Sequence, residues 1–223
     1  MSAMSPGSRS HTELIVVRHG QSRGNVEGRF GGHGPTPLTP HGRLQAAAAG
    51  RRLAAELAPE VLISSDLPRA LETARAIAEA TGLELGTDPG LRERSVGDWD
   101  DQLFKEIAER YPDDWRRMTE REHGFSPPGA ETIDAVFARV GATVDRLVEA
   151  HAGQRVAVVS HGIAIFHMFA HICGLGSPAG DLPVFALVDN ASVSRFRCYP
   201  GGRWRIVSLN DVGHLAGVND PTE

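Results

Sequence analysis

Two apolar stretches far apart in the chain end in the same way. Residues 14–20 read L-I-V-V-R-H-G, and residues 156–162 read V-A-V-V-S-H-G. Four consecutive apolar residues are typical of a strand that is covered on both faces, as in the centre of a parallel sheet. Ligands of such sheets bind outside the carboxyl ends of the strands. If both stretches are central strands, Arg18, His19 and His161 lie together at that edge.

Helical patterns alternate with the strand patterns along the rest of the chain. Thr39 and Pro40 predict the start of one helix. A second helix has Pro68 in its first turn and Asp66 as its candidate N-cap, so Arg69 can reach the same sheet edge. The predicted elements are helices over 40–57, 67–78, 131–150 and 162–172, strands over 13–18, 61–63 and 156–160, and alternating runs near 184–188, 192–198 and 203–208.

This alternation predicts an α/β fold with one domain and a mainly parallel central sheet that carries helices on both faces. The 223 residues suffice for one substantial core. We expect the domain to span residues 13–215, with disordered tails at 1–12 and 216–223. The charged and irregular segment at about 94–128 predicts a small cap of helices and loops over the site.

Composition excludes several classes of partner. The net charge is −5 and the sequence pI is about 6.1, which disfavours nucleic acid and anionic membranes. No apolar run is long enough to span a bilayer, and residues 1–12 lack the apolar centre of a secretory signal. Two cysteines, Cys173 and Cys198, are too few for a disulfide framework. We expect a soluble protein of the cytoplasm without nucleic-acid or membrane partners.

Two arginines and two histidines at one edge make a compact cationic pocket on an acidic protein. Guanidinium groups match the geometry of phosphate oxygens, so this pocket favours a phosphoryl group over a carboxylate. The loop at 19–38 contains R-F-G-G-H-G-P, and its glycines allow a close approach of the backbone to a ligand.

These residues, with others in order along the chain, resemble the histidine phosphatase superfamily, also called the phosphoglycerate mutase-like family. The resemblance covers about residues 13–210 and implies the phosphoglycerate mutase-like fold. It rests on R-H-G-Q-S at 18–22, Asn25, P-L-T-P-H-G-R-L-Q-A at 37–46, S-S-D-L-P-R-A-L-E-T-A at 64–74, L-R-E at 91–93, P-P-G-A-E-T at 127–132, S-H-G at 160–162 and D-N-A-S-V at 189–193.

The resemblance implies a role for each matched residue. His19 would attack phosphorus and form a phosphohistidine that water later hydrolyses. Arg18, Arg69 and His161 would hold the phosphoryl oxygens and offset charge in the transition state. Glu93 would donate a proton to the leaving oxygen and then take one from water. The scheme requires no metal and no other cofactor.

Further phosphate or substrate contacts are expected around the pocket. The predicted binding residues are Gln21, Ser22, Asn25, Gly31, Gly32 and Gly162, the glycines through backbone N–H groups. Simpler interpretations compete with two assignments. Asn25 could cap the loop instead, and Glu93, in the charged run R-E-R, could be a solvated surface carboxylate.

Other motifs favour structural roles. His167 and His171 have a spacing that can bind a metal, but the pattern lacks an accompanying glutamate, so polar positions on a packed helix are the favoured interpretation. Trp99, Trp115 and Phe125 could line the cap or pack it. The last strand, near 204–209, could be an exposed edge that pairs in a homodimer.

Three functions are open at this stage. The first is hydrolysis of a small phosphorylated metabolite, the second is a cofactor-dependent phosphoglycerate mutase, and the third is a phospho-ligand binding protein without catalysis. Mutases of the family typically carry E-R-H-Y-G, where this chain has E-R-S-V-G with Ser95 and Val96, which favours the phosphatase. Lys105, Arg116 and Arg117 could imitate the mutase's anion clamp. Retention of every matched catalytic position disfavours the binding protein.

Overall fold

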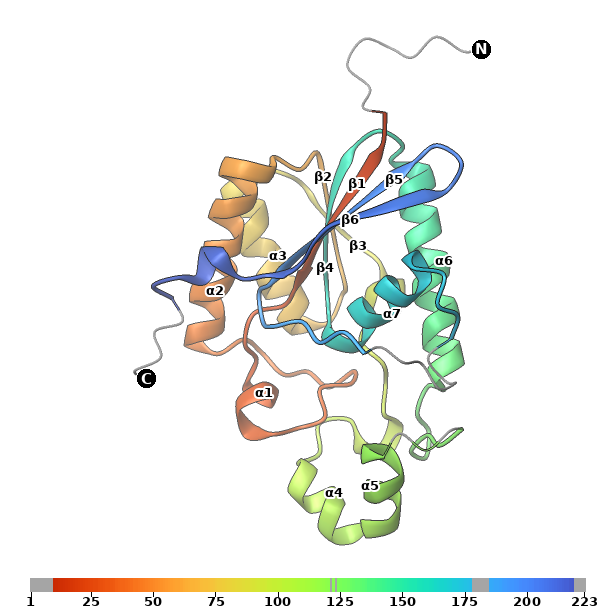
Figure 1. Cartoon of the computed structure of the whole chain (residues 1–223). Helices are drawn as coiled ribbons and strands as arrows, with labels where there is room; N and C mark the ends of the chain where they lie inside the picture. Colours follow the sequence, from red (N-terminus) through yellow and green to blue (C-terminus); the bar gives the residue numbers. More distant parts are fainter. Residues whose placement is uncertain (1–9, 121, 123, 178–184, 219–223) are drawn as a thin grey trace.

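A single six-stranded sheet forms the centre of the computed structural model, which describes residues 10–120, 122, 124–177 and 185–218 (Figure 1). The strand order is β3-β2-β4-β1-β5-β6. The first four of these run parallel to one another. Strand β5 pairs antiparallel with β1, and β6 pairs antiparallel with β5. The strands are β1 (Thr12–Arg18), β2 (Val61–Ser64), β3 (Leu85–Thr87), β4 (Arg155–Ser160), β5 (Val193–Tyr199) and β6 (Arg203–Asp211). The predicted mainly parallel α/β sheet is confirmed.

Helices cover both faces of this sheet, with α2 and α3 on one side and α6 and α7 on the other (Figure 1). The side chains of β1 alternate between the two layers: Leu14 and Val16 pack in the α6–α7 cluster, and Ile15 and Val17 pack in the α2–α3 cluster. None of the four is more than 1% exposed. The helices are α1 (Arg23–Glu27), α2 (Pro40–Arg52), α3 (Pro68–Thr81), α4 (Phe104–Arg110), α5 (Pro112–Thr119), α6 (Ile133–Ala150) and α7 (Gly162–Ile172).

The start of α2 follows its sequence signals, whereas the start of α3 does not. Thr39 caps α2 by accepting a hydrogen bond from the Gly42 N–H at 2.9 Å. The N-cap of α3 is Leu67 and not Asp66 as predicted. The carboxylate of Asp66 instead accepts two hydrogen bonds from the Arg92 guanidinium, the one from Nε at 2.6 Å. This bidentate ion pair occupies both oxygens that a cap would use.

The segment predicted as a cap forms a separate lobe beyond the carboxyl ends of the strands, with α4 and α5 as its helices (Figure 1). It has its own small core of Phe30, Trp99 and Ile107, against which Trp115 and Phe125 pack. Trp99 is only 2% exposed. The aromatic side chains therefore pack the lobe.

Several local expectations differ from the structure. The loop at 19–38 contains the five-residue helix α1, and the short strand β3 has no sequence prediction. No strand forms over residues 185–188, where the Val188 carbonyl accepts a hydrogen bond from Arg18 instead; residue 184 lies outside the described part of the chain. The predicted tails also lie mostly outside it, although Thr12 already belongs to β1.

Strand β6 is an edge of the sheet, as expected. Its Ile206 and Leu209 are 45% and 38% exposed. Pairing of this edge in a homodimer stays a prediction. Within the described residues, no helix is both long and apolar enough to cross a membrane.

Candidate active site

The register of the two central strands brings the two histidines together. β1 and β4 are parallel neighbours, with Arg18 opposite Ser160. The His19 N–H donates to the Ser160 carbonyl at 3.0 Å, so each strand delivers its histidine to the same place. The imidazole rings of His19 and His161 have centroids 5.1 Å apart. The repeated sequence ending therefore has a geometric counterpart at the sheet edge.

The hydrogen bonds of His19 fix which ring nitrogen carries the proton. Nδ1 lies 2.7 Å from the Gly20 carbonyl oxygen, which can only accept, so Nδ1 is protonated. Nε2 then has a lone pair and accepts from the Arg69 Nε–H at 3.2 Å. Burial and the charges of Arg69 and Arg18 hold the pKa of His19 well below its usual value. The ring is therefore neutral at physiological pH, with Nε2 as its basic atom.

Arg69 comes from the first turn of α3 and is 2% exposed. Its guanidinium also donates to the Gly32 carbonyl at 2.8 Å and to the Gly34 carbonyl at 3.2 Å. A Cβ atom on Gly31 would lie 3.4 Å from the same guanidinium. Burial lowers the pKa of Arg69, and the carboxylate of Glu93 opposes this effect. The backbone carbonyls of residues 29–35, here called the glycine loop, thus hold Arg69 against His19.

His161 is completely buried, and its Nε2 lies 2.8 Å from the Ser65 hydroxyl oxygen. That oxygen accepts from the Leu67 N–H at 3.3 Å, so its own proton can go to the histidine. The Nδ1 atom of His161 is buried without a partner in the described structure. Burial, Arg69 and His19 hold the pKa of His161 well below its usual value. Sequence reasoning gave Ser65 no role, although its position directly after β2 places it at this edge.

Arg18 completes the cationic side of the pocket. Its guanidinium donates to the Val188 carbonyl, while its Nε is buried without a partner among the described residues. Burial lowers the pKa of Arg18, and the negative charges of Glu93 and Asp189 oppose this effect. A Cβ on Gly162 would lie 3.7 Å from its guanidinium carbon, an ordinary van der Waals distance, so the first residue of α7 lies directly beside Arg18.

Glu93 reaches the same cluster from the loop after β3. Its carboxylate accepts from the backbone N–H groups of Ile163 and Ala164, both at 3.1 Å, in the first turn of α7. It also accepts from the Arg94 N–H at 2.9 Å. A carboxylate at a helix N-terminus is stabilised by the helix dipole. Glu93 is therefore half-buried and bound in place, not a solvated surface residue.

The loop residues after His19 make mostly structural contacts. Ser22 is the N-cap of α1 and is 2% exposed, and it exchanges hydrogen bonds with Asn25 in a capping box. The Gln21 side chain accepts from the Thr39 hydroxyl at 2.8 Å. The Asn25 Oδ1 atom also accepts from the Asn190 amide at 3.2 Å, so the oxygen of this side chain is used within the protein.

Asn190 has no predicted role, although it lies in the D-N-A-S-V motif. Its amide donates to the His19 carbonyl at 3.0 Å as well as to Asn25. It therefore ties the loop after β1 to the segment before β5.

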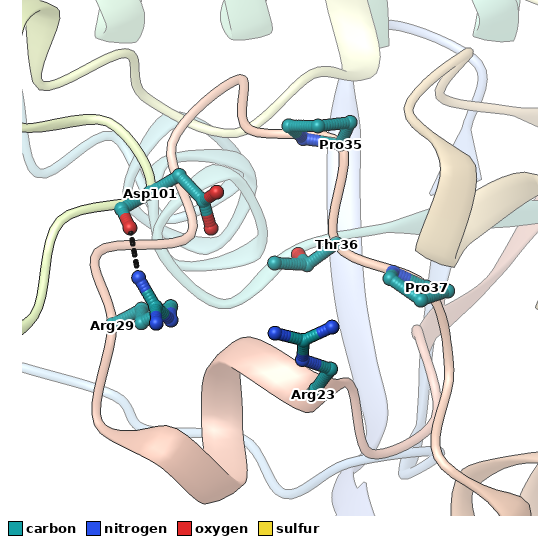
Figure 2. A pocket seen from close by; sticks show the side chains of 6 residues that line it. All are labelled: Arg23, Arg29, Pro35, Thr36, Pro37 and Asp101. Carbon is teal, nitrogen blue, oxygen red and sulfur yellow. Dashed lines mark hydrogen bonds between the residues drawn. The ribbon is translucent and has the colours of Figure 1, made fainter.

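A cavity of about 240 Å³ lies beside the glycine loop, between α1 and the lobe (Figure 2). The Arg29 guanidinium donates to the backbone carbonyl of Asp101 at 2.8 Å across its wall. Both arginines of the cavity also bond to Glu27. Its lining residues are Arg23, Arg29, Pro35, Thr36, Pro37 and Asp101, so neither histidine of the site borders it.

The basic residues considered for an anion clamp are paired on their own lobe. Lys105 is 84% exposed and lies 3.9 Å from Glu109. Arg116 pairs with Glu120 at 2.7 Å. Arg117 pairs with Asp114 and Glu122 and covers the Phe125 ring. The structure therefore does not bring them to the histidines as ready-made phosphate donors.

The two histidines of α7 are explained by packing. His171 lies 2.9 Å from Asp145 on α6. His167 is 1% exposed, and burial with nearby Arg94 and Arg139 lowers its pKa to about 4. The described residues contain no group of three or more His, Cys, Asp or Glu side chains that could hold a metal ion.

A neutral imidazole with its Nε2 lone pair facing Arg69, one buried and one partly buried guanidinium group, a second imidazole and a nearby carboxylate define a site for phosphoryl transfer through histidine. Known proteins support this class. The chain belongs to the histidine phosphatase superfamily (branch 1), whose family model matches residues 14–212. It is thus an enzyme of the histidine phosphatase type, and the binding-protein interpretation is not supported.

Several similar proteins carry names for this chemistry. "Phosphoglycerate mutase-like protein 4" from Arabidopsis thaliana is 34% identical over 207 residues, covering 92% of this chain and 87% of that protein. "Metal-independent phosphoserine phosphatase" from the same plant is 34% identical over 93% of this chain and 84% of its own. The structure of a mycobacterial glucosyl-3-phosphoglycerate phosphatase superimposes with a TM-score of 0.78 at 32% identity, covering 90% of this chain and 99% of that one.

Proposed function

We propose that this chain hydrolyses the phosphomonoesters of small metabolites through a phosphohistidine on His19. The observation that carries the proposal is the state of the His19 ring. The Gly20 carbonyl fixes the proton on Nδ1 at 2.7 Å, and the Nε2 lone pair lies in a buried cationic pocket 3.2 Å from Arg69 Nε. A neutral imidazole in such a pocket is the nucleophile that this chemistry requires.

In the first step, the Nε2 lone pair of His19 attacks phosphorus and the bond between phosphorus and the ester oxygen breaks. Glu93 in its protonated form gives its proton to that oxygen, so the alcohol leaves neutral. The phosphoryl group is then bound to His19. The backbone N–H groups of Ile163 and Ala164 stabilise the carboxylate that Glu93 becomes.

In the second step, water attacks the phosphohistidine and loses a proton to the Glu93 carboxylate. The bond between phosphorus and Nε2 breaks, and inorganic phosphate leaves. Glu93 is again protonated and His19 is again neutral, so the cycle closes without a metal ion or another cofactor.

The phosphoryl oxygens are held by Arg18, Arg69 and His161. Arg18 Nε and His161 Nδ1 are buried donors without partners among the described residues, and phosphoryl oxygens would satisfy both. The Ser65 hydroxyl, by donating to His161 Nε2, keeps the proton of His161 on Nδ1. Further donors to the phosphoryl oxygens in this proposal are the Asn25 side chain and the backbone N–H groups at Gly31, Gly32 and Gly162.

Hydrolysis is preferred over the mutase reaction because Lys105, Arg116 and Arg117 are paired on α4 and α5. We propose that the lobe at 94–128 acts as a cap that selects the alcohol part of the substrate. Relatives named for phosphoserine and glucosyl-3-phosphoglycerate suggest alkyl phosphates with a carboxylate as first candidates. We place the enzyme in the cytoplasm, in keeping with the free thiols of Cys173 and Cys198.

Release of phosphate from a panel of phosphomonoesters tests the proposal. The panel contains O-phosphoserine, 4-nitrophenyl phosphate, and 3-phosphoglycerate with and without its bisphosphate primer, and each is assayed with wild type and His19→Ala. Hydrolysis that is lost in the variant is the expected result. Isomerisation of primed 3-phosphoglycerate without release from any ester would establish the mutase instead.

A further inference from the structure

The loop that carries Glu93 is held from behind by one side chain of α6. Arg139 donates from NH1 to the Gly90 carbonyl at 2.9 Å and to the Arg92 carbonyl at 3.0 Å. Its NH2 donates to the carbonyl of Glu93 itself at 3.3 Å. A single guanidinium thus satisfies three backbone carbonyls within four residues of the proposed general acid, which an arginine can do because it has five donors in a fixed plane.

Glu131 fixes the orientation of Arg139. Its two carboxylate oxygens accept from the Arg139 Nε at 3.0 Å and from NH2 at 2.9 Å. One of them also accepts from the Ser95 N–H at 3.0 Å, two residues after Glu93. Burial favours a higher pKa for Glu131, but the hydrogen bonds from Arg139 and Ser95 outweigh it and lower the pKa. We call this pair the Arg139–Glu131 clamp.

The clamp acts on the backbone of Glu93 and leaves its carboxylate untouched. The carboxylate bonds only to N–H groups of α7 and of Arg94 among the contacts described. The His33 ring adds a third support by donating from Nε2 to the Glu93 carbonyl at 2.9 Å. The backbone of Glu93 is thus held by Arg139 of α6 and by His33, and its carboxylate is held by α7 and Arg94.

We propose that Arg139 is a positioning residue that sets the reach of Glu93 toward the leaving oxygen. This proposal rests on the proposed function, in which Glu93 is the proton donor. Displacement of a reacting group by about 1 Å can cost about 100-fold in rate. Loss of the clamp frees the carbonyls of Gly90 and Arg92 and leaves His33 as the remaining donor to the Glu93 carbonyl. The loop is then less constrained, and the carboxylate moves with it.

Esters with different leaving groups distinguish a misplaced proton donor from a damaged phosphate pocket. A 4-nitrophenolate ion leaves without a proton, so its ester does not depend on Glu93 for cleavage. An alkoxide needs the proton, and general acid catalysis typically contributes about 10²–10⁴-fold. Loss of positioning therefore lowers kcat/KM for the alkyl ester alone, because kcat/KM reports the step in which the alcohol leaves.

The experiment compares Arg139→Gln and Arg139→Lys with wild type and with Arg52→Gln. Arg52 is a matched control, because it is a mostly buried arginine that pairs with Asp211 and lies on α2, on the sheet face opposite α6 (Figure 1). The groove of about 560 Å³ beside Arg139 lets water reach the freed carbonyls, which favours folding of the variants. Each protein is assayed on 4-nitrophenyl phosphate and on the best alkyl phosphate of the panel, with thermal unfolding measured in parallel.

We expect Arg139→Gln to lower kcat/KM about 100-fold for the alkyl ester and less than about 3-fold for the aryl ester, with a partial effect for Arg139→Lys. Arg52→Gln should lower the unfolding temperature without changing the ratio between esters. An equal loss for both esters, or no loss, in either Arg139 variant would overturn the positioning role. If Arg139→Gln does not fold, Arg139→Lys decides. If wild type cleaves neither ester, the proposed function fails and this role fails with it.

Discussion

Acid should destabilise this protein through its buried histidines well before its carboxylates titrate. His19, His161 and His167 are between 0% and 3% exposed, and all three have a pKa below the usual value, about 4 for His167. In the unfolded chain each histidine has a pKa of about 6.5. The unfolded state therefore binds protons that the folded state does not bind, and the free energy of unfolding falls as the pH drops below about 6.5.

The magnitude follows from proton linkage. A histidine that is neutral in the folded protein and has an unfolded pKa of about 6.5 removes about 2 kcal/mol of stability between pH 7 and pH 5. Three such residues together remove about 5–6 kcal/mol, against a total stability of about 5–15 kcal/mol for a typical domain. Carboxylates with lowered pKa values, such as Asp211 at about 2, contribute mainly below this window.

Urea unfolding followed by circular dichroism at half-unit steps from pH 7 to pH 5 measures this slope. His161→Gln should flatten it by about one third, or about 2 kcal/mol over the window. Thr143→Val is the control, because it removes a hydroxyl from a side chain that is 1% exposed without removing a titrating group. If the free energy of unfolding of His161→Gln depends on pH as steeply as that of wild type, the conclusion that His161 is buried and neutral is wrong.

Three further perturbations separate the pocket from the lobe. Arg69→Lys should lower kcat/KM about 10²–10³-fold with an unchanged circular dichroism spectrum, because the bond to His19 Nε2 and the fork to the glycine loop are lost; a loss below tenfold would contradict this. Trp99→Ala should lower the free energy of unfolding by about 3–5 kcal/mol in urea titrations, and a cost near zero would mean that the lobe has no core. The double variant Arg116→Ala/Arg117→Ala should change kcat/KM less than about 2-fold, because the described bonds of both side chains go to acidic groups of the lobe, and loss of such exposed pairs costs only about 0–1 kcal/mol of stability; a tenfold loss on phosphoglycerate would restore the anion clamp.

The sheet was predictable because its signal is local. Residues 14–17 of β1 and 156–159 of β4 are all apolar and buried, and the alternation of the two clusters needs only the period of a strand. Strand β3 has three residues and no apolar run, so its pairing with β2 depends on tertiary contacts. The N-cap of α3 was predicted wrongly for a similar reason. Asp66 pairs with Arg92, which is distant in sequence, and Leu67 is the N-cap instead.

The same distinction between local signals and tertiary contacts applies to the candidate site. His19, His161 and Arg69 follow directly from strand ends and a helix start, which sequence patterns locate. Ser65 and Asn190 act through partners about 100 and 170 residues away, and no periodicity identifies such contacts. The sequence patterns located the two histidines and the arginines around them, whereas the contacts of Ser65 and Asn190 depend on the tertiary structure.

The proposed nucleophile and the proposed proton donor have largely different supports. His19 and its phosphate donors are fixed by β1, β4, α3 and the glycine loop. Glu93 is held mainly by α6 and α7, with further bonds from His33 of the glycine loop to its own carbonyl and from Ser160 of β4 to the Leu91 carbonyl. Loss of a support on the α6 side, such as Arg139, is therefore expected to alter protonation of the leaving oxygen more than the grip on phosphate. Because the loop at 90–93 leads directly into the lobe at 94–128, the proposed selection of the alcohol would take place next to the proposed proton donor. Aryl and alkyl esters should then respond differently to changes in the lobe, and equally to changes at Arg69.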